Sequence, residues 1–251
     1  GWTADAQVFW RTAAYNMDLD AFTQKFAGDM RGTQVGTPMY GIFAPGTITP
    51  NPGFGTGWSD AGVIIPWTGW IQSGDNRIIE QNWDAMEKYL ASILKQNPDH
   101  LWRNGFGIPF GDWLTPTQTT PEDLIATAYS AYDASLMKQM ADATGRSAKS
   151  AEYEKLFEEI KDAFAKAYIR SDGFVGTVDH YPSIPPPTIS PEAGSYNSKS
   201  VVETQTGYVL ALYLNLVPPR LRAAAAEKLV QKIKDNHWLL GTGFLGTPYL
   251  L

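Results

Sequence analysis

The stretch DNRIIEQNWDAMEKYLASILKQNP, residues 75–98, decides the fold class. Its large apolar residues follow one another in steps of three and four, which places their side chains on one face of an α-helix. They are Ile79, Trp83, Met86, Leu90 and Ile93. Pro98 ends the pattern, because proline lacks an amide hydrogen and clashes with the preceding turn. The stretch predicts one long amphipathic helix.

Apolar residues with the same helical spacing recur in the sequence before and after this helix. We expect further helices over residues 5–28 or 5–32, 59–73, 120–145, 148–168, 204–216 and 219–236, with another starting near Thr247. Strand is expected only in short pieces near Met39–Phe43 and Phe174–Val178. The pattern predicts an all-α fold with helices in antiparallel pairs, which either stack in layers or close into a ring.

The amino-acid composition limits the classes of function that the chain can have. The 251 residues fit a single domain, 1–251, and 43% hydrophobic residues supply a core. A net charge of −6 argues against nucleic acid as a partner. No apolar run is long enough to span a membrane. Cysteine is absent and the three histidines have no metal-ligand spacing, so we expect neither a metal site nor a cofactor.

Three segments share one composition of glycine, tryptophan and aspartate: residues 1–5, 57–60 and 111–113. Each is predicted to lie in a loop beside the start of a helix. Aromatic rings pack on the apolar faces of sugars, and carboxylates accept hydrogen bonds from sugar hydroxyls. We therefore expect one sugar-binding concavity formed by the tryptophans and aspartates of these segments: Trp2, Asp5, Trp58, Asp60, Asp112 and Trp113.

A structural interpretation of the same segments stays open. Asp5 and Asp60 are placed to act as N-caps of the helices that follow them. Trp58 and Trp113 are placed to pack onto their own helices. In that case each segment would serve its own helix, and the aspartates would lie on unrelated faces.

The remaining polar candidates are weaker. Asp179-His180 lies in an irregular loop, and the segment 203–206 fits a helix cap. Three glutamates have lysine partners at helical or adjacent spacing and are expected on solvated faces; the pairs are Glu158 with Lys161, Glu159 with Lys155, and Glu227 with Lys228. Nucleophile motifs such as Gly-x-Ser-x-Gly do not occur.

Taken as a set and in order, five blocks resemble the catalytic domain of bacterial α-L-rhamnosidases, glycoside hydrolase family 78. They are Gly1-Trp2-Thr3-Ala4-Asp5-Ala6-Gln7-Val8-Phe9; Gly57-Trp58-Ser59-Asp60-Ala61 followed by Val63-Ile64-Ile65-Pro66-Trp67; Phe110-Gly111-Asp112-Trp113-Leu114; Thr204-Gln205-Thr206-Gly207-Tyr208; and residues 242–251, TGFLGTPYLL. Ala4 stands where the family usually has glycine.

The resemblance implies an (α/α)6 barrel and inverting hydrolysis of terminal α-L-rhamnosides. It implies that Asp5 corresponds to the family's aspartate of the first block, and that Trp2, Trp58 and Trp113 are its aromatic rhamnose contacts. The partner would be a rhamnose-containing glycoside.

The family pattern places the general acid in an Asp-Glu-Arg run before the first block, and the general base after the last block. Both are therefore expected outside these 251 residues, so no catalytic residue is assigned with certainty within the chain. We expect a fragment with an incomplete barrel, inactive alone, whose exposed apolar helix faces favour a homo-oligomer. The alternatives are a non-catalytic carbohydrate- or protein-binding helical fragment, or another α/α-barrel glycosidase or lyase.

Overall fold

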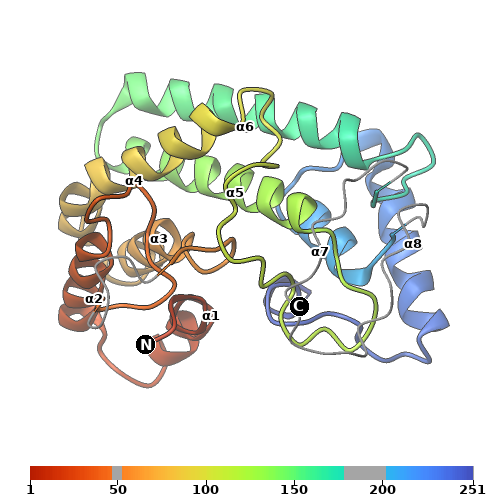
Figure 1. The fold of residues 1–251 in the computed structure, drawn as a ribbon, viewed down its shortest axis with the longest axis horizontal. Coiled ribbons are helices and arrows are strands. Elements are labelled where there is room, and N and C mark those ends of the chain that lie inside the picture. The colour runs from red at the N-terminus through yellow and green to blue at the C-terminus, as the bar shows by residue number, and fades with distance from the viewer. Residues whose placement is uncertain (47–52, 178–201, 251) are drawn as a thin grey trace. The chain divides into compact units, whose positions relative to one another are not determined.

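The computed structural model describes residues 1–46, 53–177 and 202–250, and its regular elements there are helical (Figure 1). In chain order they are α1 (Thr3–Ala14), α2 (Asp20–Gly32), α3 (Ala61–Ser73), α4 (Arg77–Gln96), α5 (Glu122–Ala143), α6 (Ser147–Tyr168), α7 (Gln205–Tyr213), η1 (Pro219–Leu221), α8 (Arg222–Asp235) and η2 (Thr247–Tyr249). The all-α prediction is confirmed.

Extended backbone in the described ranges forms only isolated bridges between single residue pairs. One joins Trp2 to Phe43, at the end of the piece predicted near Met39–Phe43. Two others, from Ile169 to Val175 and from Thr177 to Val202, fall on the piece predicted near Phe174–Val178. Val178 itself lies outside the described residues.

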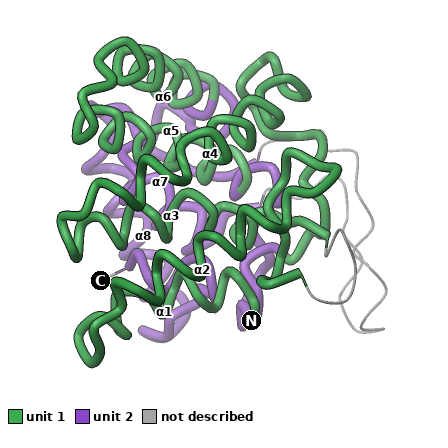
Figure 2. Tube along the Cα trace, turned by 90° about the vertical axis from the view of Figure 1, so that its left-hand side faces the viewer, with its two compact units in different colours: residues 1–110, 126–163 green, residues 111–125, 164–251 purple. Residues whose placement is uncertain are grey.

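The chain divides into two compact units, coloured separately in Figure 2. Unit 1 comprises residues 1–110 and 126–163, and unit 2 comprises residues 111–125 and 164–251. Helices α5 and α6 contribute residues to both units. The single partial domain predicted for residues 1–251 stays a prediction.

In unit 1 the helices α3 and α4 form an antiparallel pair joined by a tight turn. Gly74 ends α3 with a φ of +71°, the left-handed conformation that glycine adopts without steric cost. The apolar face predicted for residues 79–93 is buried along α4. The pair packs against α1 and α2, as the segregation of apolar residues on one face requires.

The continuous helix predicted from residue 5 to residue 28 or 32 is wrong, because the chain breaks after Ala14 and restarts at Asp20. Side chains between these points bond to nearby backbone instead. The Asn16 amide donates to the Thr12 carbonyl at 3.0 Å, and Asp18 accepts from the amide of Asp20 at 3.0 Å. Asparagine and aspartate compete locally with helical hydrogen bonds in this way.

A three-residue turn reverses the chain between α5 and α6. Gly145 has a φ of +69°, and the amide of Arg146 donates to the carbonyl of Ala141 at 2.8 Å. This six-to-one hydrogen bond after a left-handed glycine is the Schellman ending of a helix. The prediction of antiparallel helix pairs is thus met in unit 1 by α3–α4 and by the parts of α5 and α6 that belong to this unit, residues 126–143 and 147–163.

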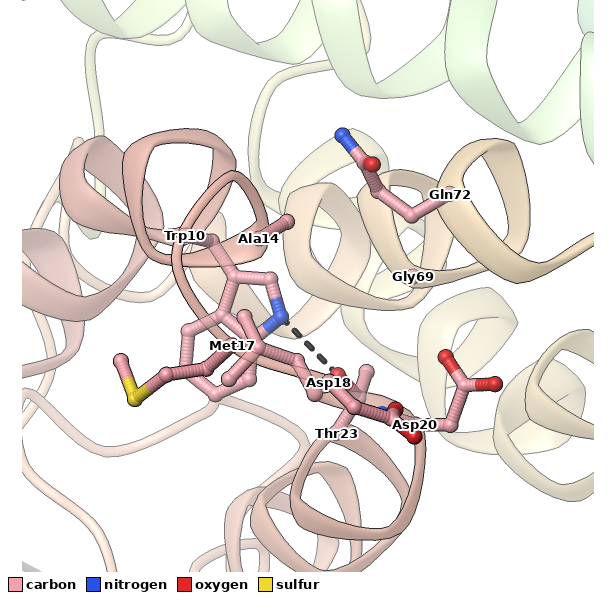
Figure 3. Close-up of a pocket in the computed structure, with 9 residues that line it drawn as sticks. Trp10, Ala14, Met17, Asp18, Asp20, Thr23, Gly69 and Gln72 are labelled. Atoms are coloured by element: carbon pink, nitrogen blue, oxygen red, sulfur yellow. Dashed lines mark hydrogen bonds between the residues drawn. The ribbon is translucent and has the colours of Figure 1, made fainter.

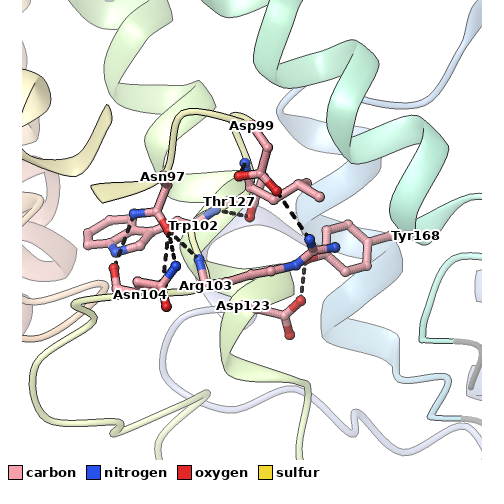
Figure 4. Close-up of polar contacts among 9 residues, drawn as sticks. Asn97, Asp99, Trp102, Arg103, Asn104, Asp123, Thr127 and Tyr168 are labelled. Atoms are coloured by element: carbon pink, nitrogen blue, oxygen red, sulfur yellow. Dashed lines mark hydrogen bonds and ion pairs between the residues drawn. The ribbon is translucent and has the colours of Figure 1, made fainter. Parts of the chain in front are cut away.

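The loop after α4 is organised by one side chain, Asn97 (Figure 4). Its Oδ1 accepts from the amides of Arg103 and Asn104, each at 2.9 Å, and its Nδ2 donates to the Asn104 carbonyl at 3.1 Å. The amide of Trp102 then donates to the Thr127 hydroxyl of α5 at 2.9 Å. These bonds fix the start of the segment that leads to Phe110.

In unit 2, α7 packs against α8. Thr204 caps α7, since its hydroxyl accepts from the amide of Gly207 at 3.0 Å. The helix predicted over residues 219–236 begins as the 3-10 turn η1 and continues as α8. The helix expected near Thr247 is the single 3-10 turn η2 within the described residues.

Candidate functional site

The first Gly-Trp-Asp segment is held in place at the start of α1. Trp2 has an extended backbone and pairs with Phe43, and the amide of Thr3 donates to the Ile42 carbonyl at 2.9 Å. The Thr3 hydroxyl donates to the same carbonyl at 2.9 Å. These bonds leave the Trp2 side chain 49% exposed at the N-terminal end of the helix.

The second segment forms a closed turn before α3. The amides of Trp58 and Ser59 donate to the Gly55 carbonyl at 3.1 and 2.8 Å, and the Ser59 hydroxyl donates to the Tyr40 carbonyl at 2.6 Å. The Gln7 amide of α1 donates to the Gly57 carbonyl. Gln7 follows the first segment on α1, so this bond ties the second segment to the helix that the first segment begins.

Phe110 joins the two tryptophans into one aromatic cluster. Its ring centroid lies 6.1 Å from that of Trp2, nearly perpendicular to it, and 4.2 Å from that of Trp58. Phe43 adds a fourth ring, 5.6 Å from Trp2 and again edge-on. We name these four residues the aromatic cluster. Trp2 is its most exposed member, while Trp58 is buried beneath Phe110.

Backbone pairing places Phe110 in this cluster. Gly55 forms a bridge with Gly107, and the amide of Ile108 donates to the Phe54 carbonyl at 2.8 Å. A Cβ atom on Gly107 would lie 2.1 Å from that carbonyl oxygen, so only glycine permits the approach. Phe110 belongs to one of the sequence motifs but was not predicted as a site residue, because its ring partners Trp2 and Trp58 lie far from it in sequence.

The aspartates of unit 1 lie in different environments. Asp5 is exposed in the first turn of α1, where the helix dipole favours negative charge. Asp60 is fully buried. It occupies the N-cap position of α3 without capping it, and accepts instead from the amide of Gly57 at 2.6 Å and the Tyr89 hydroxyl at 3.0 Å. Burial raises the pKa of Asp60, and hydrogen bonds from Asp133, Gly57 and Tyr89 oppose that rise.

The third segment lies in unit 2, where Asp112 organises the loop 241–247. Its Oδ2 accepts from the Thr206 hydroxyl at 2.5 Å and the Gly243 amide at 2.6 Å, and its Oδ1 accepts from the amides of Leu245 and Gly246 at 2.7 and 3.0 Å. Four donors fill the acceptor positions of this buried carboxylate.

Trp113 is 45% exposed, and its carbonyl accepts from the amide of Phe244 at 2.8 Å. The structure thus brings together Trp2 and Trp58 within unit 1, and Asp112 and Trp113 stand next to each other in unit 2. A single concavity shared by all six residues stays a prediction.

A separate cavity of about 180 Å³ opens between α1, α2 and α3 (Figure 3). Asp18, Asp20 and Gln72 line it, and the Trp10 indole nitrogen donates to the Thr23 hydroxyl at 3.0 Å in its wall. None of the six predicted site residues belongs to its lining.

The model of the bacterial alpha-L-rhamnosidase 6 hairpin glycosidase domain family matches this chain over residues 1–251. The chain belongs to that family. An alpha-L-rhamnosidase of Streptomyces avermitilis is 39% identical over the whole chain, which covers 21% of that protein. One from Formosa agariphila is 32% identical over the whole chain, which covers 25% of it. The chain thus spans about a fifth to a quarter of these curated relatives.

Solved structures share the fold as well as the sequence. The crystal structure of the Streptomyces avermitilis alpha-L-rhamnosidase complexed with L-rhamnose matches the whole chain with a TM-score of 0.82 and 36% identity, over 21% of its own chain. The predicted family and fold class are therefore confirmed, and the chain is part of a rhamnosidase 6-hairpin domain.

Two of the weaker candidates of this rhamnosidase domain, Glu158 and Glu159, form ion pairs on α6. Lys161 lies 3.4 Å from Glu158, and Lys155 lies 3.5 Å from Glu159, as predicted for ion pairs on a helix surface. Asp179-His180 lies outside the described residues. Within the parts of the chain that the structure covers, no group of three or more acidic or histidine side chains is arranged to hold a metal, and no helix is long and apolar enough to cross a membrane.

Proposed function

We propose that the protein carrying this chain hydrolyses terminal α-L-rhamnosides, and that this chain supplies part of the surface that binds the rhamnose ring. The observation that carries the proposal is the aromatic cluster, with the exposed Trp2 at the N-cap of α1 and Asp5 in the first turn of that helix. It occurs in a chain that belongs to the rhamnosidase family.

Rhamnose suits such a surface because it is a deoxy sugar with both apolar and polar sides. Its methyl group and ring C–H bonds can pack against an exposed indole, while its hydroxyls can donate to a carboxylate. Trp2 offers the exposed aromatic ring, and Asp5 offers a carboxylate that faces solvent. Phe110 packs edge-on against this indole, and Trp58 packs on Phe110.

The aspartates of the three motifs have different roles: one is open to bind sugar, and two stabilise the local fold. Inverting hydrolysis needs a general acid and a general base roughly 6.5–9.5 Å apart, each open to the substrate. Asp60 is fully buried, and the carboxylate oxygens of Asp112 already accept hydrogen bonds from four protein donors. We infer that neither performs acid or base catalysis, and that Asp5 binds sugar hydroxyls.

The test uses the full natural protein with an aryl α-L-rhamnoside. We expect turnover, with the β-anomer of rhamnose formed first, as inversion requires. Asp5→Asn should lower kcat/KM roughly 10- to 100-fold, the effect of losing one charge-assisted hydrogen bond, whereas the exposed Asp162→Asn should not. Trp2→Ala should raise KM, whereas Trp238→Ala, which removes another exposed tryptophan, should not.

Two results would contradict this proposal. Sugar binding without turnover by the full natural protein would favour the non-catalytic alternative, and the α-anomer as first product would rule out inversion. The 251-residue chain alone is expected to bind without turnover. Activity within about tenfold of the full protein would contradict that expectation, since the loss of a single general acid or base commonly costs on the order of 10²–10⁴ in rate.

A further inference from the structure

Two carboxyl groups meet in the interior of unit 1. Asp60 stands at the start of α3 and Asp133 in the middle of α5, and both are 0% exposed. The two carboxyl groups lie close enough to act on each other's ionisation, and neither oxygen of Asp133 has a hydrogen-bond partner among the described residues. Ionised carboxylates are almost never buried without a compensating cation or donor set, so this contact needs a chemical explanation.

The donors around the pair are unequal. Asp60 accepts from the amide of Gly57 and from the Tyr89 hydroxyl, one on each oxygen. In the described part of the chain no N–H or O–H donor of another residue reaches either oxygen of Asp133. Two carboxylates form a hydrogen bond only when one of them carries a proton. The proton therefore belongs on Asp133, which donates to an ionised Asp60.

The groups around Asp60 and Asp133 favour a proton on Asp133. Burial, followed by the negative charge of Asp60 and the hydrogen bond to it, raises the pKa of Asp133 well above its usual range. The other titratable groups facing the pair are the buried hydroxyls of Tyr40 and Tyr89, both with raised pKa values, so they stay neutral beside it. Arg31 acts on Tyr40 from α2, and its guanidinium is bonded to Asn82 at 2.5 Å.

Asp60 closes the turn that carries Trp58. Its Oδ2 binds the amide of Gly57, whose φ of +79° brings the chain back on itself. Trp58 follows directly and packs on Phe110 with ring centroids 4.2 Å apart. A displaced Asp60 carboxylate would release this amide and let Trp58 shift beneath the exposed part of the aromatic cluster.

We propose that Asp133 is a positioning residue of the rhamnoside site: it donates its proton to Asp60 and so fixes the turn of residues 55–60 that carries Trp58. The proposal rests on the proposed function for the role of the aromatic cluster. It assigns to α5 a part in substrate binding that acts through Asp60 and the turn carrying Trp58.

The experiment compares Asp133→Asn, Asp133→Leu and Asp133→Ala in the full natural protein, with Asp162→Asn as an exposed control on α6. Hydrogen exchange of the peptide covering residues 53–60 reports the turn itself. Asparagine keeps a permanent N–H donor, so its exchange should match the wild type. Leucine and alanine remove the donor, and should speed exchange roughly 10- to 100-fold, as expected for one charge-assisted hydrogen bond.

Kinetics with an aryl α-L-rhamnoside supplies the second readout. Asp133→Leu should raise KM with little change in kcat, and Asp133→Asn should restore the wild-type KM. Wild-type exchange in Asp133→Leu would overturn the proposal, as would an asparagine variant as damaged as the leucine variant. If the natural protein turns over no rhamnoside, the proposed function fails, while the exchange of residues 53–60 still decides the role of Asp133.

Discussion

Replacing Asp133 by asparagine should change how the stability of unit 1 depends on pH. In the folded protein Asp133 holds a proton between itself and Asp60, in a site with no exposure to solvent. In the unfolded chain the same carboxyl ionises with a pKa of about 3.9. Folding above that pH therefore takes up one proton at this position.

The sign of the effect follows from the proton count. The folded state binds more protons than the unfolded state, so the stability contributed here is fully present below about pH 3.9 and is lost as pH rises toward the raised pKa of Asp133. Within that window each pH unit costs about 1.4 kcal/mol, or roughly 2.7 kcal/mol over two units. The asparagine of the Asp133→Asn variant would carry its donor at every pH, so this loss should disappear.

The measurement is the opening free energy of α5 from native-state hydrogen exchange of peptides covering residues 126–143, corrected for the pH dependence of chemical exchange. The quantity of interest is the difference between Asp133→Asn and wild type, because Tyr40, Tyr89 and Arg31 are present in both. That difference should favour the variant increasingly with pH, by about 1.4 kcal/mol per unit. Parallel pH profiles for the two proteins would refute the shared proton.

Two further substitutions test the packing around the motifs. Asp112→Asn should destabilise unit 2 by roughly 1–3 kcal/mol, because an amide nitrogen in place of Oδ2 faces the Gly243 amide and leaves that buried donor unpaired; unchanged urea unfolding would contradict this. Gly62→Ala should lower the free energy of unfolding by roughly 1–3 kcal/mol, since the added Cβ would lie 2.2 Å from the Tyr40 ring. Gly28→Ala in α2 is the control: its Cβ would meet only Arg31 at 3.5 Å, so it should stabilise the protein by up to about 1 kcal/mol. Equal melting temperatures for the two alanine variants would show that the contact with Tyr40 is not a constraint.

The helices were predictable because burial of one face imposes a period on the sequence, as in residues 79–93 of α4. The same rule failed between α1 and α2. There the apolar spacing continues through Tyr15, Leu19 and Phe22, while the Asn16 and Asp18 side chains bond to local backbone and break the helix. Periodicity records which face is buried, and it does not record such local competition.

The site was predictable only in part. The motif tryptophans could be named from their neighbours, but Phe110 joins them through pairing with residues 54 and 55, which no local pattern encodes. Asp133 was missed although a signal was present: it is the only Asp, Glu, Lys or Arg between Asp123 and Lys138, inside a helix stretch rich in alanine and tyrosine. An acid that such a stretch buries must have a partner or carry a proton.

The number of protein hydrogen-bond donors around each carboxylate explains why the aspartates of the three similar segments differ in role. The oxygens of Asp112 accept from four protein donors and have no lone pair left for a ligand. Asp60 has two donors, and a protonated neighbour supplies the third. Asp5 lies in solvent, so its lone pairs are open to sugar hydroxyls. A buried carboxylate can take up a ligand only by giving up donors that hold the fold, which is why the proposed rhamnose contact falls on the most exposed of the three.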